Sequence, residues 1–146
     1  MDKEQIIEAL NKNLRAELSA VEMYSAHAQA IPESGIASGV RAIMEVEQRH
    51  AQALAGRIEA LGGTPVAPGG PEGVAGRAAG AATAQASTAD MLRLELAEEQ
   101  QFIKDYAIEI AEIMEDETTL DMLHEHLNDE IEHSRWMKAR LMALGG

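Results

Sequence analysis

Two copies of a Glu-x-x-His motif are the residues of this chain best suited to chemistry. They are Glu47 with His50 and Glu130 with His133. Residues three apart lie on the same face of a helix, so the carboxylate and the imidazole of each motif can reach one metal ion. Each glutamate also interrupts an apolar stripe, and a buried carboxylate needs a partner such as a cation. The two motifs therefore predict a metal site inside a helical core.

Two further glutamates interrupt apolar stripes in the same way. Glu17 precedes the first motif and Glu99 precedes the second, at nearly the same separation, and each is followed two turns later by a tyrosine, Tyr24 or Tyr106. Glu98 is adjacent to Glu99, but only Glu99 lies on the core stripe. The repeat of Glu, Tyr and Glu-x-x-His indicates an ancient duplication, which places the two sets of ligands about a pseudo-twofold axis.

Charge balance indicates that this site holds two metal ions. Four carboxylates carry four negative charges and neutral imidazoles carry none, so two divalent cations would neutralise the cluster. Carboxylate and imidazole ligands with open positions suit iron, with manganese as the alternative, whereas zinc usually takes fewer ligands in a tetrahedron. The predicted metal ligands are Glu17, Glu47, His50, Glu99, Glu130 and His133.

Size and charge restrict the class of protein. The chain has 146 residues, a net charge of −13 and no cysteine, so thiolate metal sites and disulfides are excluded, and nucleic acid or an anionic membrane surface is an unfavourable partner. No segment is apolar over the ~18 residues of a membrane span, and no apolar run follows the charged N-terminus. We therefore expect a cytoplasmic protein.

The apolar periodicity predicts an all-α fold in a single domain over 1–146. Four helices are expected at about 2–31, 34–61, 88–114 and 118–144, with Asp2 and Gln5 capping the first. Residues 62–87 are rich in Gly, Pro and Ala and are predicted to be a long crossover between helices two and three, with a short helical turn within 74–86. A flexible tether between two hairpins is the alternative. No fifth helix is expected.

Three segments resemble bacterioferritins. Residues 10–28, with the sequence LNKNLRAELSA continuing through Tyr24 to His27, resemble their first helix, 91–99 their third, and 129–136 their fourth. The resemblance implies a ferritin-like four-helix bundle in which the six predicted ligands hold two iron ions and Fe(II) is oxidised. Gln48 stands where these proteins place their haem-ligating Met, so haem is not expected. Without a fifth helix, a homodimer is expected rather than the usual cage, with a larger assembly as the alternative.

Several neighbouring residues have two interpretations. Tyr24 and Tyr106 are expected to donate hydrogen bonds to the ligand carboxylates. The alternative is that they relay electrons, and for this reason they are included among the candidate catalytic residues. Asp129 and Glu95 either bond the outer nitrogens of the two ligand histidines or lie on exposed faces. The remaining histidines are interpreted as structural or exposed, although His126 has the alternative of an extra ligand; they are His27, His124 and His126.

The predicted function is oxidation of Fe(II) by O2 or H2O2 at a di-iron centre, in iron storage or homeostasis. A rubrerythrin-like peroxidase is one alternative, and Glu95 or Glu98 would supply the additional glutamate that this family carries. The other alternative is a structural or binding bundle whose metal serves only to stabilise the fold.

Overall fold

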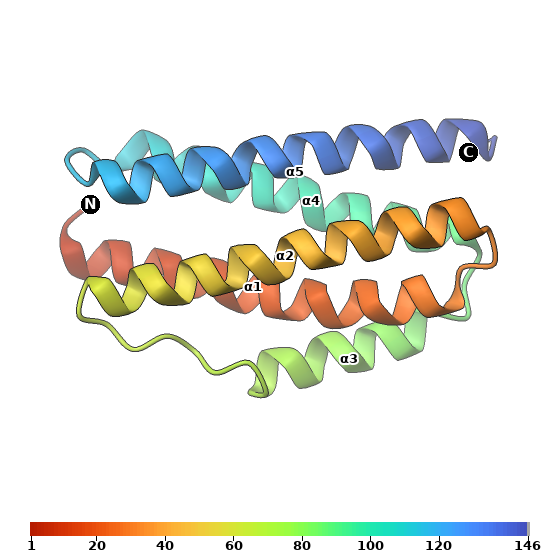
Figure 1. Ribbon diagram of the computed structural model, residues 1–146, viewed down its shortest axis with the longest axis horizontal. Helices are drawn as coiled ribbons and strands as arrows, with labels where there is room; N and C mark the ends of the chain where they lie inside the picture. Colours follow the sequence, from red (N-terminus) through yellow and green to blue (C-terminus); the bar gives the residue numbers. More distant parts are fainter. Residues whose placement is uncertain (146) are drawn as a thin grey trace.

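The computed structural model describes residues 1–145, and this part of the chain folds into five α-helices (Figure 1). Four are long and form the bundle, and the third is short. They are α1 (Lys3–Ala30), α2 (Ser34–Ala60), α3 (Pro71–Thr83), α4 (Thr88–Glu112) and α5 (Glu117–Ala143).

The N-termini of three of the long helices, α1, α4 and α5, are capped by side chains that satisfy free backbone groups. Asp2 accepts a hydrogen bond from the backbone N–H of Gln5 at 2.9 Å, and the Gln5 side chain accepts one from the N–H of Asp2 at 2.8 Å. The capping box expected for the first helix is therefore present. Ser87 caps α4 through the N–H of Asp90. These contacts fix where each helix starts and so fix the height of its ligands in the bundle.

The four long helices pair as two hairpins. Helix α1 packs against α2, α4 packs against α5, and the hairpins meet where α1 contacts α4 and α2 contacts α5. Figure 1 shows the α4–α5 pair lying along the α1–α2 pair. The core between them is aliphatic, with Leu10, Leu54, Leu92 and Leu123 fully buried. The apolar stripes of all four helices face this core, which also brings the glutamates that interrupt the stripes to its centre.

The prediction of a bundle with no fifth helix is wrong, because a fifth helix, α3, lies within the crossover. It begins with Pro71 in its first turn, and Figure 1 shows it beside α1. Its buried residues are Gly73, Gly76 and Gly80, and the last two lie directly against α1. A Cβ at Gly76 would lie 2.7 Å from the Cα of Ser19. Glycine suggests a loop by propensity, but here its small size allows a close helix–helix contact.

No described helix is both long enough and apolar enough to cross a membrane.

Candidate metal centre

The six predicted ligands come together at the middle of the bundle. Helix α1 contributes Glu17 and α4 contributes Glu99, while α2 and α5 each contribute a Glu-x-x-His pair. The four glutamates have no exposed surface, and His50 and His133 are 3% and 8% exposed. A helix normally buries only apolar residues on its core stripe, so four buried carboxylates in one place require a specific reason.

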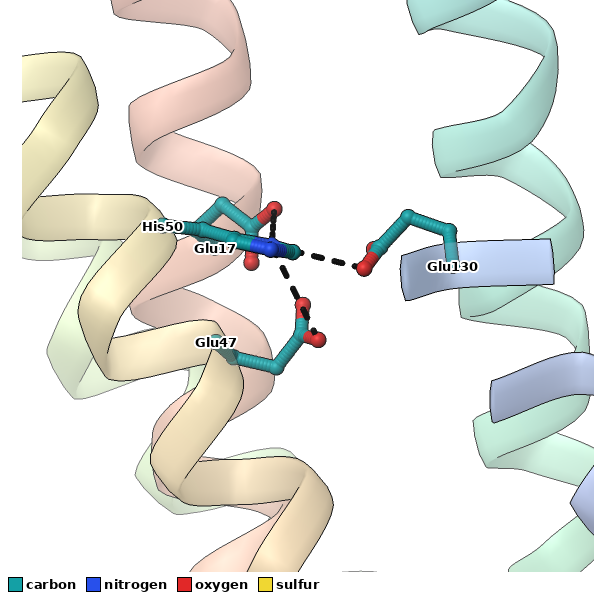
Figure 2. Close-up of side chains that lie close together, drawn as sticks. All are labelled: Glu17, Glu47, His50 and Glu130. Carbon is teal, nitrogen blue, oxygen red and sulfur yellow. Dashed lines mark ion pairs between the residues drawn. The ribbon is translucent and has the colours of Figure 1, made fainter. Parts of the chain in front are cut away.

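The first group of donors surrounds His50, as Figure 2 shows. Its Nδ1 lies 3.4 Å from an oxygen of Glu17, 4.0 Å from one of Glu47 and 3.4 Å from one of Glu130. One donor atom from each of the four residues lies within 4.8 Å of the others. This spacing suits a single cation with mixed oxygen and nitrogen ligands.

The second group surrounds His133 in the same manner. Its Nδ1 lies 2.7 Å from an oxygen of Glu99, 3.1 Å from one of Glu47 and 3.5 Å from one of Glu130. Glu47 and Glu130 therefore belong to both groups. Two cation positions that share two carboxylates form a dinuclear arrangement, in which the shared groups can bridge the ions.

Several donor atoms of the two groups have no hydrogen-bond partner, although they are buried. A buried polar atom without a partner is costly, and native proteins rarely tolerate one. Metal ions would satisfy all of these atoms at once, so the residues present fit a pair of divalent cations. The unpartnered ligand atoms are Glu17 Oε2, His50 Nδ1 and both carboxylate oxygens of Glu47 and of Glu130.

Without metal ions, the predicted ligands favour protonated forms at the positions where cations would bind. Burial and the nearby Glu17 raise the pKa of Glu47 well above its ordinary value. Burial also raises the pKa of Glu130, and the charges of Glu17 and Glu99 add to this. Burial alone would lower the pKa of His133, but the carboxylates of Glu47 and Glu99 close to its ring raise it to about 10. Metal ions must displace these protons, so binding at this site should weaken as the pH falls.

The two tyrosines bond to the two glutamates that are not shared. Tyr106 donates a hydrogen bond to Glu17 at 2.8 Å, and Tyr24 donates to Glu99 at 3.2 Å. Both tyrosines are fully buried. Burial, together with the surrounding carboxylates, raises the pKa of each phenol well above 10. Each hydroxyl therefore stays protonated and serves as a donor that orients one carboxylate.

Of the two acidic residues expected beside the ligand histidines, only Asp129 lies there. An oxygen of Asp129 is 2.8 Å from Nε2 of His50. Glu95 instead lies 2.6 Å from Nδ1 of His27, and Nε2 of His27 is 2.6 Å from the hydroxyl of Thr83. The pairing of Glu95 with a ligand histidine is therefore wrong. The Glu95–His27–Thr83 chain was not predicted, because it depends on how α1, α3 and α4 pack against one another.

The other residues singled out from the sequence lie outside the two donor groups. His126 is buried and its ring stacks on His50 with centroids 3.9 Å apart; burial lowers its pKa to about 4, and the charge of His50 adds to the effect. Glu98, His124 and Gln48 are exposed. Neither His126 nor Glu98 is a member of the groups found in the described part of the chain.

Comparisons with known proteins agree with this arrangement. The family model for the ferritin-like domain matches residues 7–144, while a comparison with curated protein sequences finds no match. A dodecameric thioferritin from Bacteroides fragilis, described as bacterioferritin-related, is 22% identical with a TM-score of 0.83, over 99% of this chain and 89% of that one.

Two further solved structures have the same fold. The bacterioferritin of Mycobacterium tuberculosis is 22% identical with a TM-score of 0.81, over 99% of this chain and 88% of that one. A ferritin-like di-iron carboxylate protein from Bacillus anthracis is 24% identical with a TM-score of 0.76, over 97% of this chain and 99% of that one. Identities this low establish the fold alone, whereas the family model spans nearly the whole sequence and confirms the resemblance. The chain belongs to the ferritin-like domain family.

Proposed function

We propose that this protein is a di-iron ferroxidase, which binds Fe(II) at the buried dinuclear centre and oxidises it with O2 or H2O2 for iron storage or homeostasis. The observation that carries the proposal is the set of six buried donor atoms without a hydrogen-bond partner, four of which belong to Glu47 and Glu130, the residues common to both His-containing groups. Two bound Fe(II) ions would supply the two electrons that reduce O2 to H2O2 with uptake of two protons. Membership of the ferritin-like family supports iron as the metal.

The residues of the chain have distinct roles in this proposal. Glu17 and His50 hold one ion, Glu99 and His133 hold the other, and Glu47 and Glu130 are shared between them. The hydroxyls of Tyr24 and Tyr106 orient the two carboxylates that are not shared. The aliphatic core around the cluster limits access of water, which strengthens the attraction between the carboxylates and the cations.

The rubrerythrin-like peroxidase receives less support from the same geometry. Its additional glutamate was expected at Glu95 or Glu98. The carboxylate of Glu95 is bonded to His27, and Glu98 is exposed. Within residues 1–145, neither belongs to the two donor groups. We therefore propose O2 or H2O2 as an oxidant for iron, and not H2O2 as the substrate of a dedicated peroxidase.

The proposal is tested by Glu47→Gln, with Glu109→Gln as the matched control. Both glutamates are buried and both changes replace a carboxylate by an amide of the same shape, but Glu109 lies outside the centre. Fe(II) is added to each protein, O2 is mixed in by stopped flow, and Fe(III) absorbance is followed.

We expect Glu47→Gln to lower the rate at least about 100-fold, since loss of an outer partner alone costs 10–100-fold in a metal site. The control should retain the wild-type rate. Wild-type protein that binds Fe(II) but shows no oxidation would favour the structural or binding bundle, and an unchanged rate in Glu47→Gln would exclude this residue as a ligand.

We also propose that the chain assembles with itself, with a homodimer as the smallest unit. The similar protein from Bacteroides fragilis is described as dodecameric, which supports self-association in proteins of this fold. Light scattering coupled to size-exclusion chromatography measures the mass directly. A monomer at micromolar concentration would contradict the proposal, and a particle much larger than a dimer would indicate a closed assembly with room for stored iron.

A further inference from the structure

The two ligand histidines differ in what holds their outer ring nitrogen. Nε2 of His50 is bonded to Asp129 at 2.8 Å. Nε2 of His133 has no hydrogen-bond partner among residues 1–145, since the contacts of this ring are all made through Nδ1. The side chain of His133 is also more exposed, at 10% compared with 4% for His50.

The internal repeat explains the difference. Asp129 directly precedes Glu130 of one motif and reaches across from α5 to His50 on α2. The residue in the corresponding position of the other motif is Val46, which directly precedes Glu47 on α2. Valine has no hydrogen-bond acceptor in its side chain. The repeat therefore keeps the ligand types equivalent but leaves only one of the two histidines with a carboxylate partner.

Within residues 1–145, no side chain near His133 is bonded to its Nε2 in place of Asp129. His133 and Val46 line a pocket of about 300 Å³ between α2 and α5, together with Gly39, Ala42, Ile43, Glu132 and Trp136. Most of these residues are apolar. Glu132 is the one carboxylate among them, and it bonds to Arg135 at 3.1 Å. The indole of Trp136 rests on Gly39, where a Cβ would lie 2.5 Å from the ring atom Cη2.

A carboxylate on the outer nitrogen of a ligand histidine fixes the ring and makes it a stronger donor, and its loss typically costs 10–100-fold in metal affinity. We propose that the two metal positions are inequivalent. The position beside His50, supported by Asp129, binds its ion tightly. The position beside His133, which faces Val46 and the pocket, binds its ion 10–100-fold more weakly and exchanges it with ions in solution. Asp129 and Val46 are positioning residues. This inference rests on the dinuclear site of the proposed function.

The test is an anaerobic titration with Co(II), a stand-in for Fe(II) whose absorption reports its ligands. The wild type should bind two ions in separate steps. Asp129→Val should weaken the tight step 10–100-fold, and because Asp129 is exposed, this change should leave folding intact. Val46→Asp should strengthen the weak step by a similar factor. Asp129→Asn and Val46→Asn keep or add an acceptor without charge, so they separate the hydrogen bond from general attraction by a carboxylate.

The outcomes distinguish this inference from the proposed function. Two ions bound with equal affinity by the wild type would preserve the dinuclear site and overturn only the inequivalence. An unchanged tight step in Asp129→Val would also overturn it. No binding of Co(II) by the wild type would overturn both the inference and the site. Asp129→Asn that behaves like Asp129→Val would show that charge, and not the hydrogen bond to His50, supports the tight position.

Discussion

Glu130 should have opposite effects on stability in the absence and the presence of metal. Its carboxylate is fully buried, belongs to both donor groups, and has two oxygens without a hydrogen-bond partner. Burial, with the charges of Glu17 and Glu99, raises its pKa well above 4.5. We predict that Glu130→Gln stabilises the protein without metal and abolishes most of the stabilisation that metal provides.

The magnitude without metal depends on pH. A carboxyl whose folded pKa is raised stabilises the fold fully below its unfolded pKa, and this contribution is lost as the pH rises towards the folded pKa. The loss is up to about 1.4 kcal/mol per pH unit. Gln does not titrate, so the difference in unfolding free energy between the variant and the wild type should be small at pH 4.5 and should grow as the pH rises above this value. An unsatisfied buried group costs about 1–3 kcal/mol, which sets the scale expected near pH 7.

The magnitude with metal follows from mass action. A cation at 100 times its dissociation constant stabilises the folded state by about 2.7 kcal/mol per site. With the free cation at 100 times the dissociation constant of the weaker site, the two sites together give at least about 5 kcal/mol in the wild type. Glu130→Gln alters both sites and replaces a charged, two-oxygen ligand by a neutral amide, so this gain should largely disappear.

Urea denaturation followed by circular dichroism measures both effects, in EDTA and in Co(II), at pH 5.5 and pH 7.5. Glu109→Gln provides a control with the same chemical change outside the centre, and it should keep the full response to Co(II). A variant that is less stable than the wild type in EDTA at pH 7.5 would refute the electrostatic reasoning. A variant that gains as much from Co(II) as the wild type would refute the assignment of Glu130 to both sites.

Two further predictions concern residues outside the centre. Burial raises the pKa of Glu109 from 4.5 to about 7, so the stability that its protonated form contributes is lost between pH 4.5 and 7. Glu109→Gln should therefore be more stable than the wild type by up to about 3 kcal/mol above pH 7. A stability difference between the two proteins that is equal at pH 4.5 and pH 8 in denaturation curves would contradict this. Gly76→Ala should lower stability by about 1–3 kcal/mol, because its Cβ would meet the backbone of Ser19 and push α3 off α1. Gly56→Ala is the control, since it has open space and should be neutral or stabilising by thermal denaturation.

The burial and clustering of four glutamates could be predicted because burial and charge conflict at their positions in the sequence itself. Glu17, Glu47, Glu99 and Glu130 each occupy a place on an apolar stripe, and the internal repeat selected Glu99 over Glu98. The structure brings these residues together and leaves Glu98 exposed. The caps were also accessible, because a capping box such as that of Asp2 and Gln5 depends only on local residues. That the cluster binds iron stays a prediction.

Features that depend on contacts between distant segments could not be predicted. Helix α3 was missed because Gly73, Gly76 and Gly80 have low helix propensity, and only its packing against α1 compensates for this cost. The partner of Glu95 was misassigned for a related reason. The sequence places Glu95 one turn before Glu99, but whether its carboxylate meets His133 or His27 depends on how α1 and α4 are rotated against each other. Propensity and spacing do not contain that information.

The internal repeat extends beyond the ligands to two buried polar pairs. Glu95 lies four residues before the ligand Glu99, and its partner His27 lies three residues after Tyr24. The corresponding positions in the other half are Asn13, four residues before Glu17, and Glu109, three residues after Tyr106, and these two are also hydrogen-bonded.

Each polar pair therefore takes one residue from each half and includes the residue one turn before an unshared ligand, but the two pairs have different chemistry. His27 also bonds Thr83 and so ties α3 to the bundle, whereas Glu109 pairs with the neutral amide of Asn13. Asp129 and Val46 likewise occupy corresponding positions of the repeat but differ in chemistry. A duplicated scaffold needs its metal ligands in both halves to hold two ions, so the ligands stay symmetric. The residues around them are free to diverge, which allows a symmetric fold to hold two metal ions in different environments.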